Sequence, residues 1–159
     1  MLHELSLLFH IIGFGLLTTT TVAGLFLHLQ YRKVQDIRSK MLLLRALKPI
    51  GLMSPIAMGI MLITGIINMT QIGVGIFTLG WLTAKIGFFA IAIVSGVLFG
   101  MKSRKRGALA QKIVSGTAPP YAEEMLDELD KQLLLFYVVM PLLLVVILYL
   151  SVWGRLGAQ

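Results

Sequence analysis

Two ionisable side chains lie deep inside apolar stretches of this sequence, and their types could support chemistry there. His10 lies in the first apolar stretch, and Lys85 lies in a run that reads GWLTAKIGFFAIAIVSGVLFG from Gly80. A neutral imidazole is a common metal ligand, and a lysine ammonium group can bind a carboxylate. A charged lysine at the centre of a bilayer costs roughly 2.5–3.5 kcal/mol on insertion scales, so we interpret Lys85 as a candidate site residue.

The neighbours expected around this pair come from two other apolar stretches. Thr64 and Asn68 lie in the second stretch, and Tyr149 lies in the fourth. We predict a site in which His10 is a metal ligand and Lys85 is a catalytic or carboxylate-binding group. Asn68 and Tyr149 are expected to help bind a cofactor. The alternative for Lys85 is structural, with its long stem carrying the ammonium group back to the membrane interface.

Small residues predict the direction in which Lys85 points. Ala92, Ser95 and Gly96 follow it at helical spacing. Because small residues mark packed interfaces between membrane helices, we expect this face, and Lys85 with it, to turn toward the bundle.

The composition indicates a membrane protein. Of 159 residues, 57% are hydrophobic and 13% are charged, and the mean hydropathy is +0.89, whereas about 25% of a soluble domain is charged. Four apolar stretches reach the length of about 20 residues that a transmembrane helix needs. They cover residues 5–27, 49–70, 78–101 and 132–153. We predict an all-α integral membrane protein with one domain over residues 1–159, a four-transmembrane-helix bundle whose second helix opens at Pro49.

The basic residues predict an orientation. Twelve of the 14 Lys and Arg residues lie in two connections, 28–48 and 102–131. Lysine and arginine accumulate in cytoplasmic loops, so we expect both basic connections inside the cell and both termini outside. This placement also argues against nucleic-acid binding as the reason for the net charge of +7. His28 is then expected to be an ordinary histidine at the inner interface, and His3 to lie at the outer surface.

The connection from residue 102 to residue 131 is expected to be helical at both ends. Its basic first part continues the third helix, TAPP at 117–120 interrupts it, and an acidic segment begins the next helix. Absence of cysteine excludes disulfides and thiolate metal sites. We interpret the connection as a solvated helical hairpin, with a docking site for a soluble partner as the alternative.

Three segments, in order, resemble a known membrane family. They are FHIIG at 9–13 followed by AGLF at 23–26, RALKPIGLMSPIAMGIMLITGI at 45–66, and GWLTAK at 80–85. Together they are similar to the four-helix family of HemJ-type protoporphyrinogen oxidases and copper-resistance D-type proteins. The resemblance implies a bacterial plasma (inner) membrane protein associated with haem b. It implies that His10 binds haem iron or a porphyrin, and that Lys85 faces a propionate or substrate.

The sequence also departs from the oxidase pattern. The oxidases tend to have histidines at two positions of the third helix that Thr83 and Gly96 occupy here. The resemblance therefore favours a membrane haem- or porphyrin-binding redox protein with one histidine ligand, and it leaves oxidoreductase activity of the protoporphyrinogen oxidase type as a hypothesis.

Two other functions remain open from the sequence. One is a copper-binding or copper-transport protein that uses His10 with some of the nine methionines, since thioethers bind Cu(I). The other is a non-catalytic small subunit of a larger membrane complex. In each case the lipid bilayer is the expected surrounding, and a homo-oligomer is an expected form.

Overall fold

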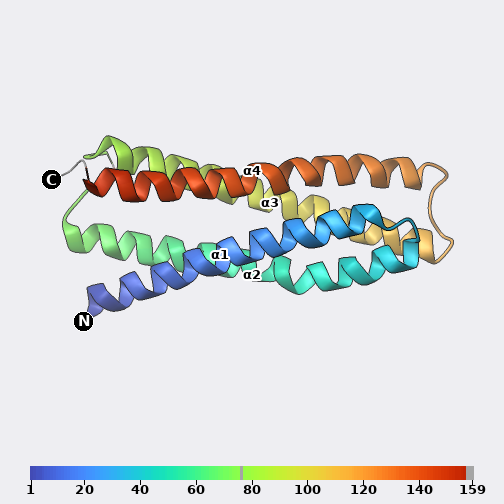
Figure 1. Cartoon of the computed structure of the whole chain (residues 1–159), viewed down its shortest axis with the longest axis horizontal. Coiled ribbons are helices and arrows are strands. Elements are labelled where there is room, and N and C mark those ends of the chain that lie inside the picture. Colours follow the sequence, from blue (N-terminus) through green and yellow to red (C-terminus); the bar gives the residue numbers. More distant parts are fainter. Residues whose placement is uncertain (76, 157–159) are drawn as a thin grey trace.

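The computed structural model describes residues 1–75 and 77–156, and within them the chain forms four α helices and no strand. The helices are α1 (Leu2–Lys33), α2 (Ile37–Ile72), α3 (Gly80–Val114) and α4 (Ala122–Leu156). They run alternately up and down in an elongated bundle (Figure 1). The start of α1, the end of α4 and the α2–α3 turn lie at one end, and the two basic connections lie at the other.

Local sequence signals explain where the helices begin and end. Asp36 caps α2, because its carboxylate accepts hydrogen bonds of 2.9 Å from both the backbone N–H and the hydroxyl of Ser39. These bonds stabilise the ionised carboxylate and lower the pKa of Asp36. Gly73 ends the same helix in a left-handed conformation with φ +70°, which glycine adopts without steric cost.

The prediction that Pro49 opens the second helix is wrong. The helix begins at Ile37, so Pro49 lies in its interior, as does Pro55. The Asp36 cap supplies a start signal, and Met41 and Leu44 pack against an apolar core at the basic end. By contrast, the expected helical extension of the third apolar stretch is confirmed, since α3 continues to Val114 and α4 begins after Pro119 and Pro120.

The helices pack as two hairpins. The α1–α2 and α3–α4 pairs are in extensive contact, α1–α4 and α2–α3 touch less, and the diagonal pairs α1–α3 and α2–α4 have no close backbone approach among the described residues. One buried core, in the middle of the bundle, contains Leu17, Ala57, Met61 and Leu144. A second, at the basic end, contains Leu109, Ala110, Ala122 and Leu126.

Much of the helical surface needs an apolar environment outside the chain. In the most apolar part of α3, only 6% of the residues are buried within the protein. With 32 to 36 residues each, the helices are about 48–54 Å long, against a hydrocarbon core of about 30 Å. All four are long and apolar enough to cross a membrane. The predicted all-α, four-helix membrane architecture is thus confirmed, and the helices continue well beyond the predicted spans.

Candidate functional site

His10 lies against α2, where its imidazole meets Thr64. The ring nitrogen Nδ1 is 2.8 Å from the Thr64 hydroxyl oxygen. A methyl group at Gly65 would lie 3.6 Å from Cε1 of His10, so the ring sits directly beside the backbone of α2. The side chain is half-buried. The sequence-predicted neighbours His10 and Thr64 are therefore in contact.

The Thr64 hydroxyl indicates which nitrogen of His10 carries the proton. That hydroxyl donates its own hydrogen within α2, to the carbonyl of Ile60 at 2.6 Å. With that hydrogen directed to Ile60, the Thr64 oxygen is oriented to accept from His10, and this arrangement favours the tautomer with its proton on Nδ1. In a neutral imidazole the lone pair is consequently on Nε2, the nitrogen that accepts a hydrogen bond or binds a metal. Metal-binding histidines typically donate a hydrogen bond from the nitrogen that does not bind the metal.

Further polar groups extend this contact into a strip between α1 and α2. The Ser6 hydroxyl donates to the backbone carbonyl of Thr64 at 3.2 Å. Asn68 is buried one turn further along α2, and its side-chain oxygen has no hydrogen-bond partner among the described residues. Nδ1 of His3, near the start of α1, is also buried and has no hydrogen-bond partner among the described residues. The sequence predicted Thr64 and Asn68 in this region but not Ser6, and it placed His3 at the surface.

Replacing Thr64 by valine tests the assigned tautomer. Valine keeps the shape of threonine but leaves Nδ1–H of His10 without its acceptor, and an unsatisfied buried donor costs about 1–3 kcal/mol. We expect the variant to unfold at a lower temperature in detergent, and its His10 ring to lose the strong preference for the Nδ1–H form in ¹⁵N NMR spectra. Thr64→Ser, which retains the hydroxyl, is the matched control. Unchanged ring spectra in the valine variant would refute the assignment.

The small residues that follow Lys85 on α3 pack within the bundle. Ala92 is completely buried, and a methyl group at Gly96 would lie 3.0 Å from the Met58 side chain of α2. The expected packing of these two small residues is confirmed. Lys85 itself is half-buried, and both Lys85 and Thr83 take part in hydrogen-bonding, ring or electrostatic interactions.

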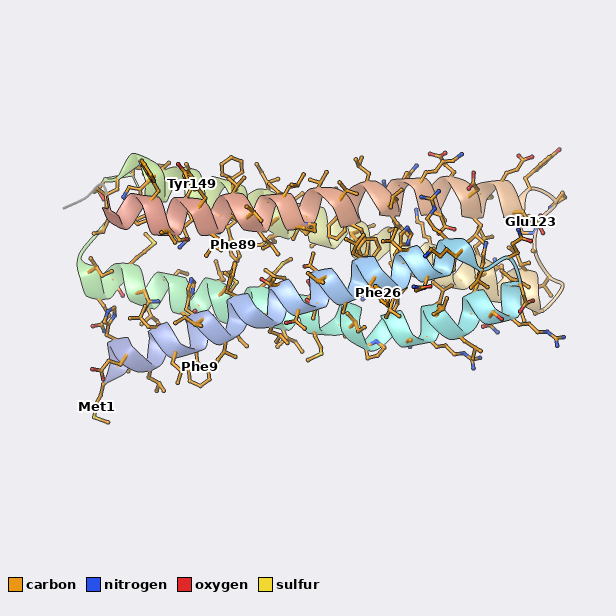
Figure 2. All side chains as sticks on the ribbon, in the orientation of Figure 1. Met1, Phe9, Phe26, Phe89, Glu123 and Tyr149 are labelled. Carbon is orange, nitrogen blue, oxygen red and sulfur yellow. The ribbon has the colours of Figure 1, made fainter. Side chains whose placement is uncertain are left out.

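Tyr149 lies apart from the polar strip. Its side chain is 57% exposed on α4, and its ring stacks on Trp153 of the same helix, with centroids 5.8 Å apart. Figure 2 shows it in the half of the bundle that contains Met1. The structure does not bring Tyr149 into contact with the α1–α2 strip that contains His10 and Asn68.

Metal-binding side chains do not cluster around His10 in the part of the chain that the structure describes. Within residues 1–75 and 77–156, no group of three or more His, Asp or Glu residues comes together to hold a metal. A neutral imidazole with its lone pair on Nε2 is the form of histidine that could bind a metal through that nitrogen.

A second polar cluster, which the sequence did not predict, lies near the basic end. Its centre is Arg106 of α3, whose side chain is completely buried. Nη1 of Arg106 lies 3.0 Å from Nδ1 of His28 on α1 and 3.3 Å from a carboxylate oxygen of Asp130 on α4. The centroid of the Tyr31 ring lies 4.9 Å from the guanidinium carbon of Arg106. Side chains thus join α1 and α3, whose backbones are not neighbours.

The proton positions in this cluster follow from its donors. Arginine only donates, so Nδ1 of His28 must accept and the imidazole must be neutral, with its hydrogen on Nε2. The expectation of an ordinary interfacial histidine at position 28 is therefore wrong, since the ring is fully buried. Nε2 of His28, and Nε and Nη2 of Arg106, are also buried and lack partners among the described residues. Buried unsatisfied donors are costly, so this cluster depends strongly on its one ion pair.

Helical spacing would have revealed part of this cluster. The buried residues of α1 include Leu17, Thr21, Gly24, His28 and Tyr31, which recur every three or four residues. The buried residues Asp130, Leu133, Tyr137, Met140 and Leu144 recur in the same way on α4. This periodicity places His28 and Asp130 on core-facing stripes. Arg106 has no comparable signal, because it lies among other basic residues of the connection.

Comparison with known proteins does not add an assignment. No protein-family model matches the chain, and neither does any curated protein or solved structure.

Proposed function

We propose that this chain is a multi-pass membrane redox protein that binds a haem or a related metalloporphyrin through Nε2 of His10. The observation that carries the proposal is the hydrogen bond from Nδ1 of His10 to Thr64, whose hydroxyl hydrogen is already committed to Ile60. It orients the imidazole and puts the lone pair on the nitrogen that would face the metal. A bound haem would supply one-electron redox chemistry.

Other residues have defined tasks in this proposal. Thr64 orients the ring of His10, which lies beside Gly65 of α2. Lys85 lies half-buried on α3, where its ammonium group would neutralise a porphyrin propionate. Asn68, with a buried side-chain oxygen that lacks a partner among the described residues, would accept a hydrogen bond from the bound molecule.

A haem titration of the detergent-purified protein tests this function. We expect saturable binding of one haem per chain, with an absorption spectrum typical of a b-type haem. Absence of saturable binding to folded protein would contradict the proposal. If the same preparation instead bound Cu(I) with a defined stoichiometry, copper binding would replace haem binding as the function of His10. A chain that binds neither and co-purifies with other membrane proteins would be a non-catalytic subunit.

We further propose that the protein lies in a bacterial inner membrane with its basic connections in the cytoplasm and the start of α1 outside. The two basic connections lie at one end of the bundle, which is the arrangement that the positive-inside rule requires. The resemblance described above supports the bacterial inner membrane.

Because the chain has no cysteine, single introduced cysteines can report this orientation. Gln71 in the last turn of α2 and Ser115 at the end of α3 are both exposed and lie at opposite ends of the bundle. We expect a membrane-impermeant maleimide to label Gln71→Cys in intact cells, and to label Ser115→Cys only after permeabilisation. The reverse pattern would overturn the orientation, and the unmodified chain is the background control.

A further inference from the structure

A hollow between α2 and α3 opens at the basic end of the bundle. It has a volume of about 270 Å³ and is lined mainly by apolar surface, with Met41 and Leu42 of α2 and Val114 of α3. Arg38 and Arg45, two turns apart on α2, complete its wall together with Gln111. Neither arginine forms an ion pair among the described residues. We name this feature the arginine hollow; it suits a group that combines apolar and negatively charged parts.

The start of α4 has the complementary character. Five of the seven acidic residues of the chain lie between residues 123 and 130. Asp130 is paired with Arg106, and Asp127 with Lys131. Glu123 and Glu124 are exposed and have no ion-pair partner among the described residues. The exposed apolar side chains Tyr121 and Met125 flank them. We name residues 121–125 the acidic corner.

Among the described residues, no ion pair joins these two surfaces within one chain. The arginine hollow is on α2 and α3, and the acidic corner is on α4 and the turn before it. The backbones of α2 and α4 do not approach closely among the described residues. The two surfaces do lie at the same level, because α3 ends at Val114 and α4 begins at Ala122 after a short turn. Figure 2 shows Glu123 at the end opposite Met1, where the basic connections are. Two copies with the same orientation in a membrane therefore present one surface to the other at the same height.

We propose that the arginine hollow of one chain receives the acidic corner of a second copy. Arg38 and Arg45 would face Glu123 and Glu124, while Met125 and Tyr121 would cover the apolar wall of the hollow. The contact joins two different surfaces, so it is heterologous, and repetition around a closed rotation gives a ring in the membrane plane. The proposal does not depend on His10 or on any cofactor.

Charge reversal tests the interface in the full chain. Arg45→Glu and Glu124→Arg each place like charges in contact, and each is expected to weaken self-association roughly tenfold, as like-charge contacts at an interface do. The double variant Arg45→Glu/Glu124→Arg restores opposite charges between positions 45 and 124 and should recover association. Arg104→Glu is the matched control, because Arg104 is exposed at the same end but does not line the hollow.

Sedimentation in mild detergent, with cross-linking in native membranes, measures the association. Loss in both single variants, recovery in the double variant and no effect in the control would support the interface. A wild-type chain that is monomeric in the membrane would overturn it, as would oligomers that neither single variant weakens. Release of a different co-purifying protein by Arg45→Glu, without any change in self-association, would assign the hollow to that partner and also overturn the proposal.

Discussion

Asp130→Ala is expected to lower the free energy of unfolding by about 3–5 kcal/mol, because it leaves the Arg106 guanidinium buried without an opposite charge. Arg106 has no exposed surface, and Asp130 is 7% exposed. Two further nitrogens of Arg106 already lack partners among the described residues, so loss of the bond to Asp130 would leave a third nitrogen with only His28 as its partner. The loss should be much larger than that of an exposed ion pair, which contributes at most about 1 kcal/mol.

The exposed Asp127–Lys131 pair, with atoms 2.7 Å apart on the same helix, supplies the matched control. Asp127→Ala should change the unfolding midpoint little. The double variant Arg106→Met/Asp130→Leu should recover most of the stability lost in Asp130→Ala, since replacing a whole buried pair by apolar groups is often neutral or stabilising. Thermal unfolding in detergent compares the four chains. Equal midpoints for Asp130→Ala and Asp127→Ala would show that the cluster does not hold α1, α3 and α4 together.

His10→Ala is expected to abolish high-affinity haem binding while leaving the helices folded. Loss of a group that only supports a metal ligand typically costs 10–100-fold in affinity, so loss of the ligand itself should exceed about 100-fold. His10 is half-buried and lies within hydrogen-bonding distance of Thr64 of α2. Truncation should therefore disturb the fold less than the Asp130 substitution does. Haem titration followed by absorbance, with circular dichroism of the same samples, separates these effects.

His3→Ala is the control for that variant. His3 lies two turns earlier on the same helix, and its Nδ1 is buried without a partner among the described residues. If it is not a ligand, its removal should leave the haem affinity within a few-fold of the wild type. Equal, strong haem binding by His10→Ala and the wild type would remove His10 as the ligand. Loss of binding only in His3→Ala would transfer the role to His3.

The sequence predicted the architecture because hydrocarbon imposes simple constraints. A helix that crosses it needs about 20 apolar residues, and four stretches meet that requirement. The helical part from Ile37 to Lys48 was missed because basic residues alternate there with Met41, Leu44 and Leu47, in a segment that the charge distribution marks as a connection. These three apolar residues are buried or half-buried in the structure. Helical spacing, rather than mean hydropathy, was the informative signal in that segment.

The sequence was less informative about which polar groups meet. Depth along a helix predicted that Thr64 could reach His10, and the hydrogen bond between them agrees with it. The depth of a residue in the membrane does not give its direction around the helix axis. For this reason the sequence grouped Tyr149 with His10 and Asn68, although its side chain is largely exposed on α4. The Arg106 cluster depends on three side chains from three helices, and each taken alone resembles an ordinary interfacial charge or histidine.

Resonance Raman spectroscopy of the ferrous haem complex tests the central claim most directly, since it observes the bond between iron and the histidine nitrogen. We predict an iron–histidine stretching band in the wild-type protein that shifts when histidine is labelled with ¹⁵N and is absent from His10→Ala. The band should also move in Thr64→Val, because the hydrogen bond on Nδ1 of His10 would be lost. A wild-type spectrum without such a band, or a band that persists unchanged in His10→Ala, would contradict the assignment of His10 as the haem ligand.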